Sequence, residues 1–297
     1  MHDRHMQVLR GANDPSNPLS ALHRHVLMGI LKDDTSWYEA HLDRTSTAFL
    51  AGRGASYQGT CAFPEPTGIN VNMMPIRLFD RSTYPSFILP YEDMIRSCLV
   101  SSWDYTNVKE PSLYERVAYL TIDESPVPAG RSHRRPGLHV ERPAVTSGRH
   151  VPYEAVNGPH GTEPFSEYKS LAWGMGGCLD GLPVDGIFMA SNVADSCKVW
   201  PVTVVDPEEV TDAHGGIEHM RDFIGAGRAL GAGEMCWITD RTPHESLPHD
   251  RDAHRQFFRL VVGRISVWYS RHNAPNPLGV QPDAPVSDAD KFAIYPV

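Results

Sequence analysis

The sequence is short of three features that mark large classes of proteins: paired cysteines, long apolar runs and clusters of positive charge. Its five cysteines are scattered without a Cys-x-x-Cys spacing, which argues against a zinc site or a disulfide framework and favours a reducing, cytoplasmic setting. The longest apolar run near the start, 26–31, is far too short to span a membrane. No basic run exceeds Arg134-Arg135 and the net charge is −9, so we expect neither nucleic acid nor a membrane as a partner. A small-molecule substrate is the expected partner, and the oligomeric state stays open.

Phosphate-binding loops are also missing. Neither GxxxxGK[ST] nor GxGxxG occurs, and the glycine-rich stretch 225–233 leads into a predicted strand rather than a helix. The length of 297 residues suits one large β-barrel domain with helical additions, and no internal repeat is present. We therefore expect a single domain over residues 1–297.

The periodicity divides this domain into parts. Helices are expected at 17–32, 37–50, 91–99 and 217–224, and the first of these begins with Asn17 as the N-cap. The residues from 116 onward change to the pattern of β-strands, and two antiparallel strands are expected at 186–192 and 197–205, joined by a turn at 193–196. The irregular stretch 144–170 has the length of a substrate cover. The organisation predicted is thus a helical and irregular part (1–110), a β core (115–270) and a C-terminal extension (271–297).

A candidate metal-binding set is spread over two segments of the β core. His139-Val-Glu141 has the spacing at which two side chains of a strand point to one face. The segment 233–244 contains an apolar stretch, then Asp240-Arg241, and places His244 after a tight turn. Two imidazoles and one carboxylate are the ligand set of a non-haem Fe(II) site that keeps coordination positions open.

Two arginines follow the distal histidine. Arg255 and Arg259 lie 11 and 15 residues after His244, in a stretch rich in β-branched and aromatic residues that predicts a long strand. Residues four apart on a strand share a face, so both guanidinium groups are expected to point the same way. Arg259 stands among apolar residues, where an idle charge is costly to bury.

In this order of HxE, His and Arg, residues 115–270 resemble the iron- and 2-oxoglutarate-dependent dioxygenases, in the manner of taurine dioxygenase, phytanoyl-CoA hydroxylase and clavaminate synthase. The resemblance implies a mainly β fold, a double-stranded β-helix or jelly roll with flanking helices. It also implies Fe(II) held by His139, Glu141 and His244, 2-oxoglutarate gripped by Arg255 or Arg259 or both, and O2 as the oxidant. Glu141 stands where Asp is commoner in the family, while the halogenating branch has a small residue there and is disfavoured. The expected reaction oxidises a C–H bond of a small polar metabolite, by hydroxylation unless desaturation or cyclisation follows, and converts 2-oxoglutarate to succinate.

Further residues are candidates for the pocket. Tyr119 lies where related enzymes keep a hydroxyl for 2-oxoglutarate, although it also suits a core position. The remaining candidate pocket residues are Asn72, Met74, Asn192 and Trp200. His249 and His254 are alternatives to His244 as the distal ligand, but they fall in a charged loop where solvated histidines are expected. Two other functions stay open: a metal-dependent cupin enzyme that needs no 2-oxoglutarate, and a ligand-binding jelly roll without catalysis.

Overall fold

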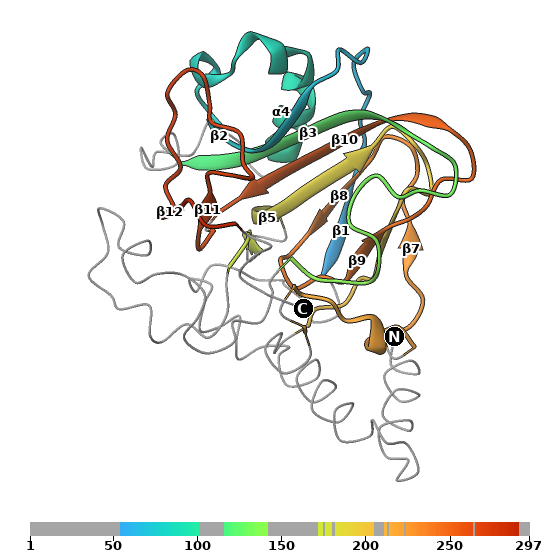
Figure 1. Cartoon of the computed structure of the whole chain (residues 1–297). Coiled ribbons are helices and arrows are strands. Elements are labelled where there is room, and N and C mark those ends of the chain that lie inside the picture. The colour runs from blue at the N-terminus through green and yellow to red at the C-terminus, as the bar shows by residue number, and fades with distance from the viewer. Residues whose placement is uncertain are drawn as a thin grey trace, which may run out of the picture.

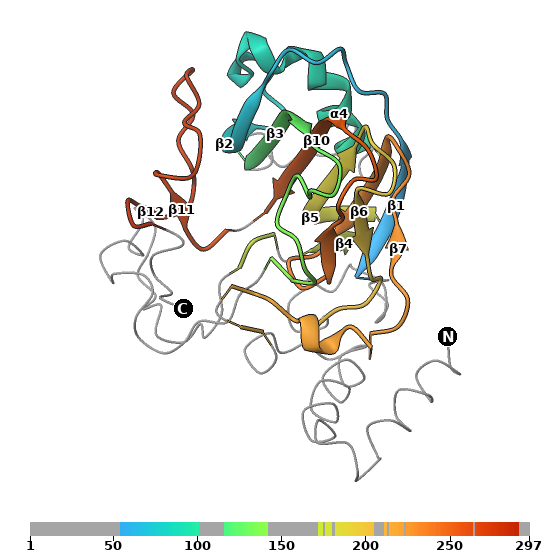
Figure 2. The same cartoon turned by 45° about the vertical axis from the view of Figure 1, so that its right-hand side comes forward.

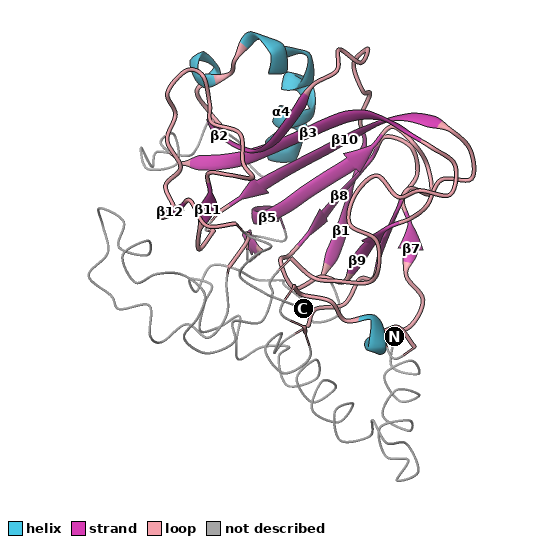
Figure 3. Ribbon diagram, viewed as in Figure 1, coloured by secondary structure: helices cyan, strands magenta, loops and turns pink. Residues whose placement is uncertain are grey.

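The computed structural model describes residues 54–100, 116–141 and 172–290, with short gaps at 175, 180–181, 205–210, 213, 223 and 264. This part of the chain is mainly β, with few helical segments (Figure 3). The strands are β1 (Ala55–Thr60), β2 (Asn70–Arg77), β3 (Val117–Val127), β4 (Gly177–Leu179), β5 (Leu182–Ser191), β6 (Cys197–Val199), β7 (Arg228–Ala229), β8 (Glu234–Ile238), β9 (His244–Ser246), β10 (Ala253–Val262), β11 (Trp268–Tyr269) and β12 (Val286–Ser287). The helical segments are the α-helix α4 (Glu92–Val100) and the 3₁₀ helices η1 (Arg81–Thr83), η2 (Ser86–Tyr91) and η4 (Glu218–Met220).

A seven-stranded antiparallel sheet forms the centre of the molecule (Figure 1). Its strand order is β1-β8-β5-β10-β3-β2, and β4 pairs with β5 beside this path. The long strands β3 and β10 pair over ten residues, from Ala253 opposite Val127 to Val262 opposite Ala118. Because hydrogen bonds along so many residues fix the register of β10, they also fix the face toward which each of its side chains points.

One face of this sheet is covered by the helical segments. Phe258, Leu260 and Val262 of β10 pack there in an apolar cluster that also contains Met94 and Ile95 of α4. Figure 2 shows α4 and the adjoining helical turns gathered on this side of the sheet. The alternate residues of β10, Arg255, Phe257, Arg259 and Val261, therefore face the other way.

A second, smaller sheet lies against that other face. It has the order β7-β6-β9, and His139 extends it through an isolated antiparallel bridge to His244. Cys197 and Val199 of β6 share an apolar cluster with Ile187 and Met189 of β5, so the two sheets pack against one another. Two facing antiparallel sheets leave an interior that side chains of both sheets line.

Several predictions from the sequence agree with the structure. The mainly β class is confirmed, and the helix predicted at 91–99 is α4. The strand predicted from 116 onward is β3, which is buried almost throughout because both faces of its sheet are covered. Gly137 takes a left-handed φ of 78°, in keeping with the turn expected before His139.

Other predictions need correction. The strand expected at 186–192 is the second half of β5, but the strand expected at 197–205 is limited to the three residues of β6. The two belong to different sheets, because the turn between them carries the chain from one sheet to the other. The helix expected at 217–224 is limited to the 3₁₀ helix η4. The helices expected at 17–32 and 37–50 and the cover expected at 144–170 lie outside the described residues. None of the helices within the described ranges is long and apolar enough to cross a membrane.

Candidate functional site

A cavity of about 770 Å³ opens between the two sheets. The large sheet contributes side chains from β2, β5, β8 and β10, and the small sheet contributes residues of β6 and β9. The segment from His133 to Glu141, which leads into the bridge at His139, lines it as well. Among the described residues of the lining are Asn72, Met73, His139, Glu141, His244, Ser246, Arg255, Phe257 and Arg259.

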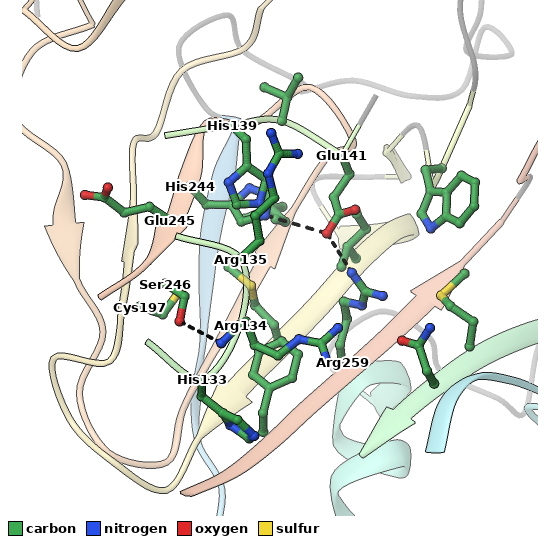
Figure 4. A pocket seen from close by; sticks show the side chains of 18 of the residues that line it. His133, Arg134, Arg135, His139, Glu141, Cys197, His244, Glu245, Ser246 and Arg259 are labelled. Atoms are coloured by element: carbon green, nitrogen blue, oxygen red, sulfur yellow. Dashed lines mark hydrogen bonds and ion pairs between the residues drawn. The ribbon is translucent and has the colours of Figure 1, made fainter. Parts of the chain in front are cut away.

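His139 and His244 are fixed side by side at this cavity (Figure 4). Their backbones exchange two hydrogen bonds: the His139 N–H donates to the His244 carbonyl at 3.1 Å, and the His244 N–H donates to the His139 carbonyl at 2.9 Å. The centres of the two rings lie 4.5 Å apart. Two residues separated by a long stretch of sequence thus form one rigid pair.

The two imidazoles are also oriented in the same way. Nδ1 of His139 lies 2.7 Å from the Gly137 carbonyl, and Nδ1 of His244 lies 2.8 Å from the Thr242 carbonyl. A carbonyl oxygen only accepts hydrogen bonds, so each Nδ1 carries a proton, and in the neutral form of each ring the lone pair is on Nε2. Burial lowers the pKa of His139 to about 3, and the nearby His244 and Arg135 add to the effect. The His139 ring is therefore neutral at physiological pH, the form in which imidazole binds metals.

Glu141 completes the cluster but is shared with an arginine. Its Oε1 atom lies 3.7 Å from Nε2 of His244 and 2.6 Å from Nη1 of Arg259 (Figure 4). Val140, between the two candidate ligands, packs with Leu138 and Ile217 in a separate apolar cluster. The alternation expected of His-x-Glu is thus present, although His139 forms only an isolated bridge and not a regular strand.

Arg255 is the other notable group of the cavity. It is completely buried, its Nε donates to Oγ of Ser191 at 3.0 Å, and its Nη1 donates to Oγ of Ser246 at 3.3 Å. In the described part of the chain no carboxylate lies within ion-pair distance of it. Burial lowers the pKa of Arg255 to about 10. A buried guanidinium held only by neutral hydroxyls is costly without a counter-ion, so this position suits a bound anion.

The structure brings most of the candidate residues to one place. His139, Glu141, His244, Arg255, Arg259 and Asn72 all line the cavity. Of the two competing histidines, His254 is exposed on β10, as expected of a solvated residue. His249 is buried, which corrects the expectation that it is solvated, and it is not part of the described lining.

Met74 does not line the cavity, and its neighbour Met73 does. The pairing of β2 with β3 shifts register between Val71 and Met74, and Met73 has a φ of 49°. Such an irregularity changes which side chains face the interior. Met74 therefore packs on the helix-covered face of the sheet.

Tyr119, Asn192 and Trp200 also lie away from the described lining. The Tyr119 hydroxyl donates to the Asp283 carboxylate and accepts from the Asp283 N–H, an arrangement that involves the C-terminal extension. Asn192 is tied to Gln256 of β10. The Trp200 indole donates to the Gly225 carbonyl at 2.9 Å, inside the apolar cluster that contains Val140.

Sequence reasoning missed several residues of the cavity. Arg134 and Arg135 line it, although in the sequence they stand out only as a short basic pair just before His139. Phe257 and Ser246 also line it, and their positions next to Arg255 and His244 on strands were the available signal.

The fit of a metal ion can be judged from the donors. Within the described ranges, no three His, Cys, Asp or Glu side chains are gathered closely enough to form a complete ligand set. Glu141, the candidate carboxylate ligand, is held by Arg259. The donor chemistry nevertheless fits, because both imidazoles have their Nδ1 atoms tied to carbonyls, the usual support of metal-binding histidines.

The chain was compared with family models, curated proteins and solved structures. No family model, no curated protein and no solved structure matches the chain.

Proposed function

We propose that this protein is an Fe(II)- and 2-oxoglutarate-dependent oxygenase built on a jelly-roll core. The observation that carries the proposal is the combination, in one cavity, of two paired histidines with a buried arginine that has no carboxylate partner among the described residues. Two facing antiparallel sheets, with the cavity between them, support the jelly roll.

His139, Glu141 and His244 would hold the metal. Their donors are two imidazole Nε2 atoms and one carboxylate, the set that suits Fe(II) and keeps positions open for other ligands. Glu141 would have to shift from, or share, its ion pair with Arg259.

The two arginines divide into different roles. Arg259 is engaged by Glu141, whereas Arg255 has only hydroxyl partners among the described residues. Arg255 bonds to Ser246, which lies two residues beyond His244 on β9, a separation on the order of 7 Å along a strand. A short dicarboxylate could reach from the histidines to Arg255, so we assign the distal carboxylate of 2-oxoglutarate to Arg255.

When bound, iron, 2-oxoglutarate and O2 supply the oxidising chemistry, with succinate and CO2 as co-products. The chain's own residues position and shield the reactants. The backbone bridge keeps His139 and His244 in one orientation, and the Ser191 and Ser246 hydroxyls aim the Arg255 fork. The substrate is a small polar metabolite whose C–H bond is oxidised, with hydroxylation as the default outcome.

The test is the addition of 2-oxoglutarate to the anaerobic Fe(II) protein. The proposal expects the weak visible absorption of a metal-bound 2-oxo acid, and its loss in Arg255→Gln. Bound iron without absorption would indicate a metal cupin that uses no 2-oxoglutarate. Absence of iron binding would leave a non-catalytic ligand-binding barrel.

A further inference from the structure

The C-terminal extension contributes to the lining of the cavity. The turn that follows β11 carries Asn273, whose side chain lies at the cavity. Two hydrogen bonds tie this part of the extension to β2: the Trp268 indole donates to the Met73 carbonyl at 2.8 Å, and the Ala274 N–H donates to the Asn72 carbonyl at 2.8 Å. The position of Asn273 is therefore fixed by contacts on both sides of it in the sequence.

Asn72 sets the orientation of the Asn273 amide. Nδ2 of Asn72 donates to the His272 carbonyl at 3.0 Å, and because a carbonyl only accepts, this atom of Asn72 must be the nitrogen. The same nitrogen donates at 3.0 Å to the Asn273 amide, whose facing atom must then be Oδ1. Oδ1 of Asn72 accepts in turn from the Thr121 hydroxyl at 3.3 Å. The Nδ2 group of Asn273 is thus directed away from Asn72.

This Nδ2 group has hydrogen-bond donors to spare. Asn273 is 8% exposed, and its Nδ2 is buried without a hydrogen-bond partner among the described residues. The adjacent His272 ring is engaged elsewhere, since its Nε2 lies 2.8 Å from Oδ1 of Asp290. A buried donor without an acceptor destabilises a fold, and a donor held rigidly at the wall of a cavity is in position to bind a ligand.

The side chains that hold this amide, Asn72 and Thr121, are uncharged. Trp173 and Tyr269 line the same cavity and stack on one another, with their ring centres 6.4 Å apart. Both rings belong to an apolar cluster that also contains Met73. A neutral donor near aromatic and apolar side chains suits an uncharged acceptor, such as a carbonyl oxygen, on a largely apolar molecule.

The amide and the candidate metal ligands belong to one cavity. Thr121, which bonds to Asn72, stands directly opposite Arg259 in the pairing of β3 with β10, and Arg259 holds Glu141. Neighbouring strands lie about 4.8 Å apart, so the amide stands on the side of the cavity where Glu141 is held. A molecule bound to Asn273 is therefore placed beside the candidate metal site.

We propose that Asn273 recognises the substrate by donating a hydrogen bond to an uncharged carbonyl oxygen, while Trp173 and Tyr269 pack against the adjoining apolar part. Asn273 is then a specificity-determining residue, and the substrate is a neutral carbonyl compound such as an amide or a ketone. That the bound molecule is a substrate rests on the proposed function, whereas the donor site itself does not.

The experiment compares cyclohexanone with methylenecyclohexane, which has the same ring and a C=CH2 group in place of C=O. Binding is measured by NMR titration of the full, ¹⁵N-labelled chain without metal. The side-chain NH2 signals that are missing from Asn273→Ala identify those of Asn273. Cyclohexanone should move these proton signals downfield, because a hydrogen bond to oxygen deshields the proton, and methylenecyclohexane should not.

The affinities test the same contact by its strength. The preference for cyclohexanone over methylenecyclohexane should fall about tenfold in Asn273→Ala, as expected when a buried carbonyl loses its donor. Asn276→Ala is the matched control, because Asn276 is buried in the same extension and outside the described lining. Its Nδ2 donates to the Pro75 and Thr83 carbonyls at 2.8 and 2.9 Å. This variant should unfold at a lower temperature and keep the preference.

Three results would overturn the proposal: Asn273 protons that do not move downfield with cyclohexanone, a preference that survives Asn273→Ala, or an equal loss of preference in Asn276→Ala.

Repeating the titration with Zn(II), which is diamagnetic and redox-inert, and 2-oxoglutarate separates this inference from the oxygenase proposal. If Zn(II) or 2-oxoglutarate does not bind while the Asn273 response persists, the oxygenase proposal fails and the donor site is supported. If both bind and the Asn273 response is absent with and without them, the donor site alone is overturned.

Discussion

Nη1 of Arg259 lies 2.6 Å from Oε1 of Glu141, while Nε2 of His244 lies 3.7 Å from the same oxygen. An arginine and a candidate metal site thus compete for one carboxylate. This relationship explains how Arg259 tolerates its buried position: it has an ionic partner where Arg255 has hydroxyls. It also predicts that changes at the two arginines have different consequences.

The competition can be measured through metal affinity. Replacing Arg259 by Gln removes both the partner that holds Glu141 and a positive charge that repels a cation. We expect Arg259→Gln to bind Mn(II) more tightly than the wild type, by roughly tenfold, because a charge-assisted contact contributes about 1.5–3 kcal/mol and only part of it is recovered. Equilibrium titration checks this, with Arg131→Gln as the control, because Arg131 is an exposed arginine outside the described lining of the cavity. Weaker Mn(II) binding would show that Arg259 supports the metal site and does not compete with it.

The paired histidines should be needed for metal but contribute little to folding. His139→Ala and His244→Ala each remove one candidate ligand and one Nδ1 hydrogen bond, and leave the backbone bridge in place. Loss of that bond should lower the free energy of unfolding by about 1 kcal/mol, whereas stoichiometric iron binding should be abolished. Metal analysis after reconstitution and thermal unfolding measure the two effects.

His254→Ala serves as the histidine control, since His254 is exposed on the same domain. It should keep full iron content. If His249→Ala loses iron while His244→Ala retains it, the ligand assignment is wrong.

From the sequence, the candidate metal-binding residues could be predicted more completely than the other residues that line the cavity. His139, Glu141 and His244 stand out because residue type and spacing alone mark them. The four-residue spacing of Arg255 and Arg259 predicts that both point to one face of a strand. It does not predict their separate roles, because the ion pair between Arg259 and Glu141 depends on three-dimensional placement.

Two candidate residues lie elsewhere than predicted, and each has a physical cause that the sequence pattern does not show. Alternation along a strand predicts Met74 as a pocket residue only if β2 is regular, and the register shift before it brings Met73 to the cavity instead. Tyr119 faces the expected side of β3, but its hydroxyl is engaged by Asp283 of the C-terminal extension, a long-range contact that no local pattern reveals. The mainly β class could be predicted without knowledge of long-range contacts, because the alternation that marks a strand is a local pattern.

Asp123 should make stability depend on acid pH. Burial alone would raise its pKa, but the neighbouring His133 ring, the hydrogen bond from Ser125 and the charge of Arg134 lower the pKa to about 2. A carboxyl whose folded pKa lies below its unfolded value near 4 stabilises the protein above that value, and the contribution is lost as the pH falls toward 2. We expect about 2 kcal/mol of unfolding free energy to disappear in this window. Denaturant unfolding of Asp123→Asn at pH 4 and pH 2 should show a smaller loss than the wild type, and an equal loss would contradict the assignment.

We expect Arg255 to favour 2-oxoglutarate binding while it lowers the stability of the ligand-free fold. Its guanidinium is completely buried, and within the described ranges its hydrogen-bond partners are the Ser191 and Ser246 hydroxyls. Without an anion it therefore carries a desolvation penalty of several kcal/mol that the hydroxyls offset in part. Arg255→Met keeps much of the volume and removes the charge. We expect the 2-oxoglutarate-free variant to unfold at the same temperature as the wild type or at a higher one.

With 2-oxoglutarate bound, the wild type should unfold at a higher temperature than Arg255→Met. A ligand that binds only the folded state stabilises it by about 2.7 kcal/mol at a concentration 100 times its Kd. Losing the charge-assisted contact at Arg255 should raise that Kd tens-fold to over a hundred-fold, so 2-oxoglutarate should raise the unfolding temperature of the Mn(II)-loaded wild type but hardly that of Arg255→Met. Arg259→Gln, by contrast, should keep most of the shift, because Arg259 is engaged by Glu141 and not by the co-substrate. If the two variants exchange these responses, Arg259 is the residue that grips 2-oxoglutarate, and if both keep the full shift, neither arginine does.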